Sequence, residues 1–325
     1  MLYPRAIVRR VAALAAITLL STFCLSESVV TTIPLIRNNC LDVDPLTRLV
    51  YVTSGDSVSV ISEKTNTQVD TIPVGIDLVG VGVNPITSRL YVSDILQDLV
   101  YVINTRTKQI VATIPVDGSP TQVAVNIKTN RIYVTETLHS TVRVIDGKTN
   151  TQIATISGPV LPDHLAINRI TNRLYISDNN FFGAVAAVDL DTNEVIAEIP
   201  TAGQFTTGVA VDFVRNLVYA ADETGILNVI DGRTNKLVRT LHLENELAGV
   251  TVDPFTRRIY LANFEINTFR FSHVDIIDGK SLRLAGALPT GVHPANMVLD
   301  PIRKLLYVGN FQEGSVTVIN AHAHP

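Results

Sequence analysis

Four acidic residues recur at nearly constant spacing, and they are the first residues whose pattern could support chemistry. Asp94, Glu136, Asp178 and Asp222 each follow a tyrosine by three residues, at intervals of 42, 42 and 44 residues. Oxygen ligands of this kind suit hard ions such as calcium. If the fold gathers the four carboxylates at one place, a divalent cation is the candidate cofactor. The alternative is that each carboxylate binds backbone groups in its own turn, which is a common role of Asp.

A second set of polar residues stands beside these positions. Gln122, Asp163 and His164 precede runs of apolar residues, while Asn263 and Asn310 occupy the position that carries an acid elsewhere. An imidazole next to a carboxylate is a candidate ligand for a transition metal. His164 is also the one candidate for a catalytic acid or base.

Other catalytic patterns are absent from the sequence. It contains no Gly-x-Ser-x-Gly, His-Glu-x-x-His or Cys-x-x-Cys motif and no EF-hand loop, and Cys40 has no recognisable catalytic partner. The sequence therefore predicts a binding protein more strongly than an enzyme.

The residues above are carried by an internal repeat of about 42 residues, which seven tyrosines mark. These are Tyr51, Tyr91, Tyr133, Tyr175, Tyr219, Tyr260 and Tyr307. Each unit has four short runs rich in β-branched residues, separated by turns; in the third unit they include residues 123–126, 131–134, 144–147 and 153–156. Four short strands per repeat predict an all-β fold, a seven-bladed β-propeller of four-stranded antiparallel blades.

The two ends of the chain complement each other. The last unit stops after its third run at Asn320, and residues 29–34 match the fourth run of the first unit, residues 68–73. We therefore expect the N-terminal strand to complete the last blade, so that residues 29–325 form one closed domain.

Several of these segments resemble the YVTN-family propeller repeat, named for Tyr-Val-Thr-Asn. The resemblance rests on Tyr51-Val52-Thr53-Ser54, Tyr133-Val134-Thr135-Glu136 and Val144-Ile145-Asp146, and it covers about 290 residues. The family occurs in bacterial periplasmic and archaeal surface-layer proteins. The resemblance implies a propeller outside the cytoplasm, with ligands bound at the face that carries the turns between second and third strands.

The first 28 residues have the composition of a secretory signal. Arg5, Arg9 and Arg10 precede an apolar run from Val11 to Leu25, which is short for a membrane span. Removal of the signal predicts a secreted, periplasmic or cell-surface protein with no transmembrane domain; an uncleaved anchor is the alternative. Without Arg5, Arg9 and Arg10 the chain has 23 basic and 30 acidic residues, which argues against a nucleic-acid partner.

The turns of the two faces differ in charge. One face collects acids, including the four recurring ones, and the other collects Lys and Arg. We therefore expect a binding or scaffold protein that receives a protein or small-molecule ligand at its acidic face. The alternatives are an enzyme of the lactonase or lyase kind with a cation in the channel, and a structural envelope protein whose basic face contacts the cell envelope.

Overall fold

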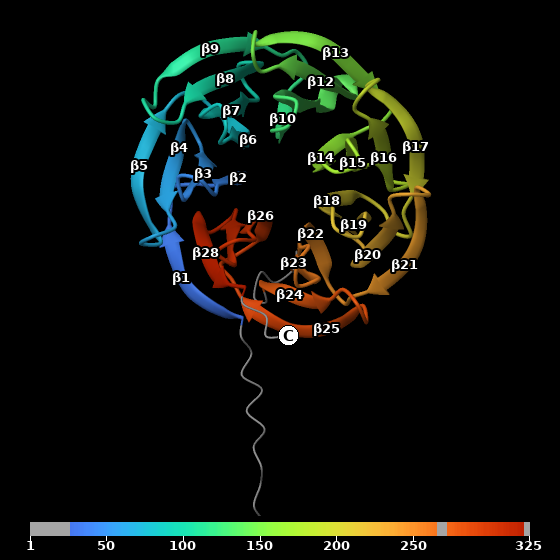
Figure 1. Ribbon diagram of the computed structural model, residues 1–325. Helices are drawn as coiled ribbons and strands as arrows, with labels where there is room; N and C mark the ends of the chain where they lie inside the picture. The colour runs from blue at the N-terminus through green and yellow to red at the C-terminus, as the bar shows by residue number, and fades with distance from the viewer. Residues whose placement is uncertain (1–26, 265–271, 322–325) are drawn as a thin grey trace, which may run out of the picture.

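The computed structural model describes residues 27–264 and 272–321. Apart from Glu27 and Ser28, the predicted secretory signal lies outside the described residues, so that expectation is not tested. Seven four-stranded antiparallel sheets stand around a central axis (Figure 1), which confirms the predicted propeller.

The blades follow one another in chain order. The first four blades contain β2 (Leu41–Asp44), β3 (Leu49–Ser54), β4 (Ser57–Ser62) and β5 (Thr67–Pro73); β6 (Leu78–Asn84), β7 (Arg89–Asp94), β8 (Leu99–Asn104) and β9 (Ile110–Pro115); β10 (Pro120–Asn126), β11 (Arg131–Glu136), β12 (Thr141–Asp146) and β13 (Thr151–Ser157); β14 (Pro162–Asn168), β15 (Arg173–Asp178), β16 (Ala184–Asp189) and β17 (Glu194–Pro200).

The last three blades contain β18 (Thr206–Asp212), β19 (Leu217–Asp222), β20 (Ile226–Asp231) and β21 (Lys236–His242); β22 (Glu246–Asp253), β23 (Arg258–Phe264), β24 (His273–Asp278) and β25 (Arg283–Pro289); β26 (Pro294–Asp300), β27 (Leu305–Asn310), β28 (Ser315–Asn320) and β1 (Ser28–Pro34). One short 3-10 turn, η1 (Thr137–His139), interrupts the strands in the described part of the chain. No helix in that part is long and apolar enough to span a bilayer.

The N-terminal strand closes the ring, as the sequence predicts. The sheet order of the last blade is β1-β28-β27-β26, and β1 pairs antiparallel with β28 from Ser28↔Asn320 to Pro34↔Ser315. Figure 1 shows β1 as the outermost strand of the last blade, outside β28. The first and last segments of the propeller thus share one sheet, so the ring has no open end.

The repeat tyrosines form the contacts between blades. Tyr51 belongs to a buried cluster with Val81, Leu90 and Val92 of the second blade. Tyr307 of the last blade packs in the same way with residues of the first blade, including Val50 and Val52. All seven tyrosines are almost fully buried. The regular spacing of tyrosine therefore reflects one apolar junction per blade.

Candidate functional site

A cavity of about 390 Å³ lies in the central channel, between the innermost strands of the blades. Those strands are β2, β6, β10, β14, β18, β22 and β26, and Figure 1 shows them around the axis. Most of the residues that line the cavity have aliphatic side chains, with Val, Ala, Leu, Ile and Met from successive blades. Its few polar side chains therefore determine what the channel can bind.

Four of those polar side chains occupy one repeat position. Cys40, Gln122, His164 and Asn296 each stand four residues before the Asp or Asn that ends the innermost strand. The same position in the other three blades holds Gly80, Gly208 and Gly249. A Cβ atom at Gly80 would collide with the carbonyl oxygen of Thr121, and one at Gly249 with that of Ala295, so close blade packing requires glycine there.

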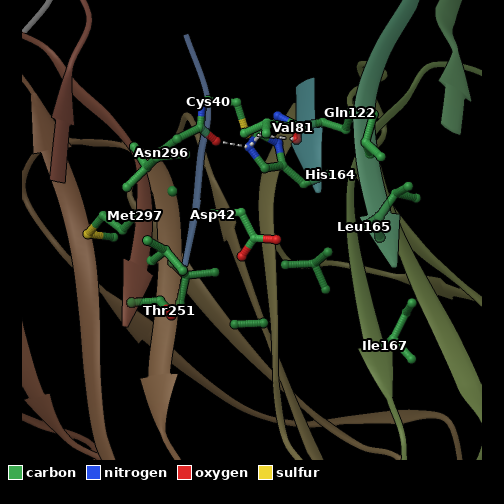
Figure 2. A pocket seen from close by; sticks show the side chains of 18 of the residues that line it. Cys40, Asp42, Val81, Gln122, His164, Leu165, Ile167, Thr251, Asn296 and Met297 are labelled. Atoms are coloured by element: carbon green, nitrogen blue, oxygen red, sulfur yellow. Dashed lines mark hydrogen bonds between the residues drawn. The ribbon is translucent and has the colours of Figure 1, made fainter. Parts of the chain in front are cut away.

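These four side chains form a chain of polar contacts that crosses the channel, which we call the polar bridge (Figure 2). The Cys40 thiol donates to Gln122 Oε1 at 3.3 Å, and the Gln122 amide lies 3.4 Å from His164 Nε2. His164 Nε2 lies 2.7 Å from Asn296 Oδ1, joining the fourth and seventh blades. Asn296 Nδ2 in turn donates to the backbone oxygen of Asn39 at 2.6 Å. The polar bridge therefore ties together side chains that are up to 256 residues apart in sequence.

The contacts of Asn296 assign the protons of His164. A backbone carbonyl only accepts, so the Asn39 oxygen requires the amide nitrogen of Asn296, and Oδ1 must face His164 as an acceptor. His164 Nε2 is therefore the protonated donor, and the Gln122 amide nitrogen 3.4 Å away is a neighbour of this N–H group rather than its hydrogen-bond partner. Nδ1 lies 3.3 Å from Asp163 Oδ2. Burial lowers the pKa of His164, but Asp163 and the bond to Asn296 outweigh it, so the net pKa is raised and the imidazolium form is favoured.

Three acids stand together near the bridge. Burial raises the pKa of Glu223, and the charges of Glu246 and Asp163 raise it further. Burial also raises the pKa of Glu246. Asp163, Glu223 and Glu246 come from the fourth, fifth and sixth blades, and we call them the acidic rim. Mutual repulsion within the acidic rim is relieved by any positive charge that enters.

Deeper in the channel, Asp42 is the acidic side chain that lines both this cavity and a second one of about 550 Å³ toward the opposite face. Figure 2 shows its carboxylate in the cavity, together with Thr251. Asp42 accepts from the backbone N–H groups of Val43 and Val83, both at 2.8 Å. Burial nevertheless raises the pKa of Asp42 to about 6, because those two bonds only partly offset the loss of water.

The four recurring acids do not line either channel cavity. Asp94 accepts from the backbone N–H groups of Ile76, Leu96 and Gln97, and Asp178 accepts from Val160 and Leu161. Each carboxylate therefore binds the loop next to its own strand, which is the second of the two alternatives that the sequence left open for these acids.

The other two acids have similar local contacts. Asp222 accepts from Thr224, Ile226 and the Asn228 amide, while Glu136 accepts from Thr141 Oγ1 and lies 2.6 Å from an Arg143 nitrogen. Both acids lie at the end of the second strand of a blade, next to turns whose N–H and O–H groups need acceptors. The physical reason for all four acids is thus the satisfaction of buried polar groups.

Asn263 and Asn310 behave like the acids whose position they share. Asn263 donates to Asp275 Oδ2, and Asn310 donates to Ser315 and Thr317. In the described part of the chain, no group of three or more His, Cys, Asp or Glu side chains could hold a metal ion. Cation binding at the recurring acids stays a prediction, without such a group to support it.

Of the candidate residues from the sequence, Gln122, Asp163 and His164 thus meet at the channel. Asn296, Asn39 and Asp42 were not among them. Alignment of the seven innermost strands on their final Asp or Asn would have found Asn296, because it shares its repeat position with Gln122 and His164. Asp42 shares its repeat position with Gly82 and Ala124. The same alignment would have singled it out as an acid at a position where these blades have small residues.

No protein-family model matches the chain, and no curated protein is similar to it in sequence. The resemblance to the YVTN repeat is therefore not confirmed. Among solved structures, the chain is similar to a chain of the hydrazine synthase of Kuenenia stuttgartiensis, with a TM-score of 0.76 and 18% sequence identity. The match covers 89% of this chain and 97% of that one. At this identity the likeness shows the shared fold alone.

Proposed function

We propose that the protein is a non-catalytic binding protein that receives a small, positively charged ligand at the channel mouth. The observation that carries the proposal is the polar bridge, which brings polar side chains of four blades together in a cavity whose other side chains are mostly aliphatic. Ligand sites of proteins commonly combine an apolar wall with a few convergent polar groups.

The charge of the ligand follows from the acids around the bridge. Asp163, Glu223 and Glu246 crowd negative charge near the mouth, and Asp42 adds a carboxyl deeper in the channel. Because these acids are not arranged as a metal-binding group, an organic cation with several N–H donors fits better than a bare ion. Its donors would bind Asn296 Oδ1 and Gln122 Oε1, the two acceptors that His164 and Cys40 now occupy.

The contacts support binding rather than catalysis. Burial raises the pKa of the Cys40 thiol to about 11, so the reactive thiolate is scarce at neutral pH. His164 Nε2 donates to Asn296 and Nδ1 faces the Asp163 carboxylate, so both ring nitrogens are already engaged within the protein.

A thermal-shift screen tests the proposal. Putrescine, arginine and choline represent organic cations, with succinate and glucose as charge-matched negative and neutral controls. A ligand that binds the native state raises the melting temperature by mass action. We expect a shift from at least one organic cation, lost in Asn296→Ala and kept in Lys148→Gln, a change at an exposed turn. Equal responses of the two variants, or no response to any cation, would contradict the proposal.

The same screen includes calcium, magnesium, manganese and zinc chlorides, because the recurring acids remain candidates for a cation. A metal-induced shift that disappears in Asp178→Asn/Asp222→Asn would establish that site. A metal-induced shift that the double variant keeps would assign the ion elsewhere.

We also propose that the protein acts outside the cytoplasm and that its repeat is of the YVTN type. The composition of the first 28 residues supports export. Glu27 is buried and its carboxylate lies 3.4 Å from Arg258 Nε, so processing that keeps Glu27 preserves a contact of the folded chain. N-terminal sequencing of naturally expressed protein should find a mature start at or just before Glu27. An intact Met1 in the soluble cytoplasmic fraction would overturn the export proposal.

A further inference from the structure

The face opposite the channel mouth carries an unusual set of exposed side chains. In six of the seven turns between the first and second strands of a blade, the same position holds a large apolar residue. We call these residues the apolar ring: Leu46, Ile86, Ile170, Val214, Phe255 and Ile302. Their exposed fractions lie between 53% and 73%. The remaining blade, the third, has Lys128 there.

The same hydrogen bond fixes the backbone at this position in every one of these turns. The Asp or Asn that ends the innermost strand accepts from the backbone N–H two residues later, as Asp44 does from Leu46 and Asp300 from Ile302. The other five turns repeat the bond. Because the blades are arranged around one axis, the six side chains lie at equivalent places around the mouth of the channel on this face.

The turn itself does not require an apolar residue. The turns between the third and fourth strands reach the same face, and several use the same bond, from Arg106 to Asn104, Lys148 to Asp146 and Arg233 to Asp231. Their corresponding position is basic and exposed in five blades. We call these residues the basic ring: Lys64, Arg106, Lys148, Arg233 and Lys280. The face thus has an apolar ring inside a basic ring, and the local backbone explains neither choice.

Two apolar-ring contacts also leave the side chains available. Phe255 packs edge-on against Phe213 with ring centroids 6.1 Å apart, and Lys304 Nζ lies 5.3 Å from the Phe255 ring. Phe255 remains 60% exposed in spite of both contacts. The apolar ring is distinguished by its regular arrangement around one mouth of the channel, and exposed apolar side chains arranged together in this way mark an interaction surface.

We propose that this face docks on the surface of an anionic lipid bilayer. Apolar side chains that enter the headgroup region, together with Lys and Arg that approach anionic lipids, are the two components of peripheral membrane binding. A ring of equivalent turns offers both components in one plane. The proposal is independent of the channel ligand, since the polar bridge lies toward the other mouth of the channel.

Two other occupants explain less of the face. A second copy related by a two-fold axis would bring the two basic rings against each other, and like charges oppose that contact. An anionic polymer would use the basic ring but leave the apolar ring exposed to water. Only a surface with negative charge above an apolar layer fits both rings.

The chain contains no tryptophan, which permits a clean test. Phe255→Trp places one fluorophore on the apolar ring, and Leu96→Trp places one at a residue that is 67% exposed on the opposite face. With vesicles of phosphatidylcholine containing about 30% phosphatidylglycerol, we expect the Phe255→Trp emission to shift to shorter wavelength, and the shift to reverse on addition of salt. Leu96→Trp should not respond, and vesicles of phosphatidylcholine alone should shift neither variant.

Vesicle co-sedimentation supplies a second measurement. Phe255→Ser/Ile302→Ser should lower the bound fraction about fivefold or more. Leu96→Ser/Leu138→Ser removes two side chains of similar exposure from the opposite face and should bind like the parent. All of these variants keep the same N-terminal segment, so any lipid binding by that segment cancels from the comparison.

Several results would overturn the proposal. Binding to anionic vesicles could be absent or unaffected by changes in the apolar ring. The two tryptophan variants could show equal spectral shifts, or the two double variants could lose vesicle binding equally. Self-association without vesicles that Phe255→Ser/Ile302→Ser abolishes would assign the face to a second copy instead.

Discussion

The buried hydroxyls of the repeat tyrosines differ from blade to blade in their hydrogen-bond partners. Tyr307 donates to Asn66 Oδ1 at 3.1 Å, whereas the Tyr91 hydroxyl has no hydrogen-bond partner among the described residues. Burial raises the pKa of Tyr91 to about 12. Tyr307→Phe should therefore lower the free energy of unfolding by about 1 kcal/mol, while Tyr91→Phe should be neutral or slightly stabilising. Urea unfolding of both variants measures the difference, and the reverse order would contradict these contacts.

The protonation of His164 is a second consequence at the scale of single residues. The pKa of His164 is higher in the folded protein than in the unfolded chain, where it is about 6.5. Protonated His164 therefore stabilises the fold fully at pH values below 6.5, and this stabilisation is lost as the pH rises through the pKa of the folded protein. In His164→Gln, the free energy of unfolding should decrease less as the pH rises between these two pKa values. His242→Gln, which removes an exposed imidazole, is the control.

NMR titration checks the cause of this shift. Asp163→Asn should lower the pKa of His164, because it removes the carboxylate 3.3 Å from Nδ1. An unchanged pKa in Asp163→Asn would show that the pair does not exist in solution.

Asp42 should produce the opposite sign of pH dependence. Its folded pKa of about 6 exceeds the ordinary value of 3.8, so folding favours the protonated form and Asp42 costs stability as the pH rises through that interval. The stability of Asp42→Asn relative to the parent should therefore rise between acid and neutral pH, by on the order of 2–3 kcal/mol. Chemical denaturation at several pH values measures this gain. A constant difference between the two proteins would mean that water reaches Asp42 freely.

At the scale of the elements, two isoleucines occupy the same repeat position, but only one of them lies on β1, the strand that closes the ring. Ile33 is 4% exposed in the last blade, and Ile72 is 3% exposed in the first. Replacement of either by Ala removes similar contacts, worth about 2–4 kcal/mol. Ile33 alone lies on the terminal strand that completes the ring.

Hydrogen exchange separates the two effects. Ile33→Ala should reduce protection of β1 and β28 through local opening, because β1 can detach without breaking another connection of the chain. Ile72→Ala should leave the protection of β1 and β28 relative to the other blades unchanged. Equal patterns of protection in the two variants would contradict a special role of β1 in closure.

At the scale of the whole molecule, the charged turns give the disk two unlike faces. The chain has a formal net charge of −4, yet the basic ring lies on one face only. At low ionic strength we therefore expect binding to cation-exchange as well as anion-exchange resin, since a local field extends over about 10 Å or more.

Charge-neutralising variants test that separation. Lys64→Gln/Lys148→Gln/Lys280→Gln should elute from the cation exchanger at lower salt than the parent. Arg37→Gln removes one exposed positive charge outside the basic ring and should elute almost unchanged. A shift of Arg37→Gln about one third as large as that of the triple variant would show that net charge, rather than its placement, governs binding to the resin.

The repeat alone was enough to determine the architecture of this protein. Recurring tyrosines, β-branched runs and the match between residues 29–34 and 68–73 predict the blades and their closure, because each feature is local or periodic and each blade repeats the same packing. Gln122, Asp163 and His164 were also found as candidates from local sequence.

Only the tertiary structure decided which polar groups meet. Asn296 reaches His164 because the ring brings the seventh blade opposite the fourth, a relation that no local pattern contains. Asp94 and Asp178 turn toward their own loops because nearby N–H groups need acceptors, whereas the sequence left both a shared site and a local role open. The direction of a side chain at a strand end depends on the tilt of its blade and on its closest donors, and both are properties of the assembled ring.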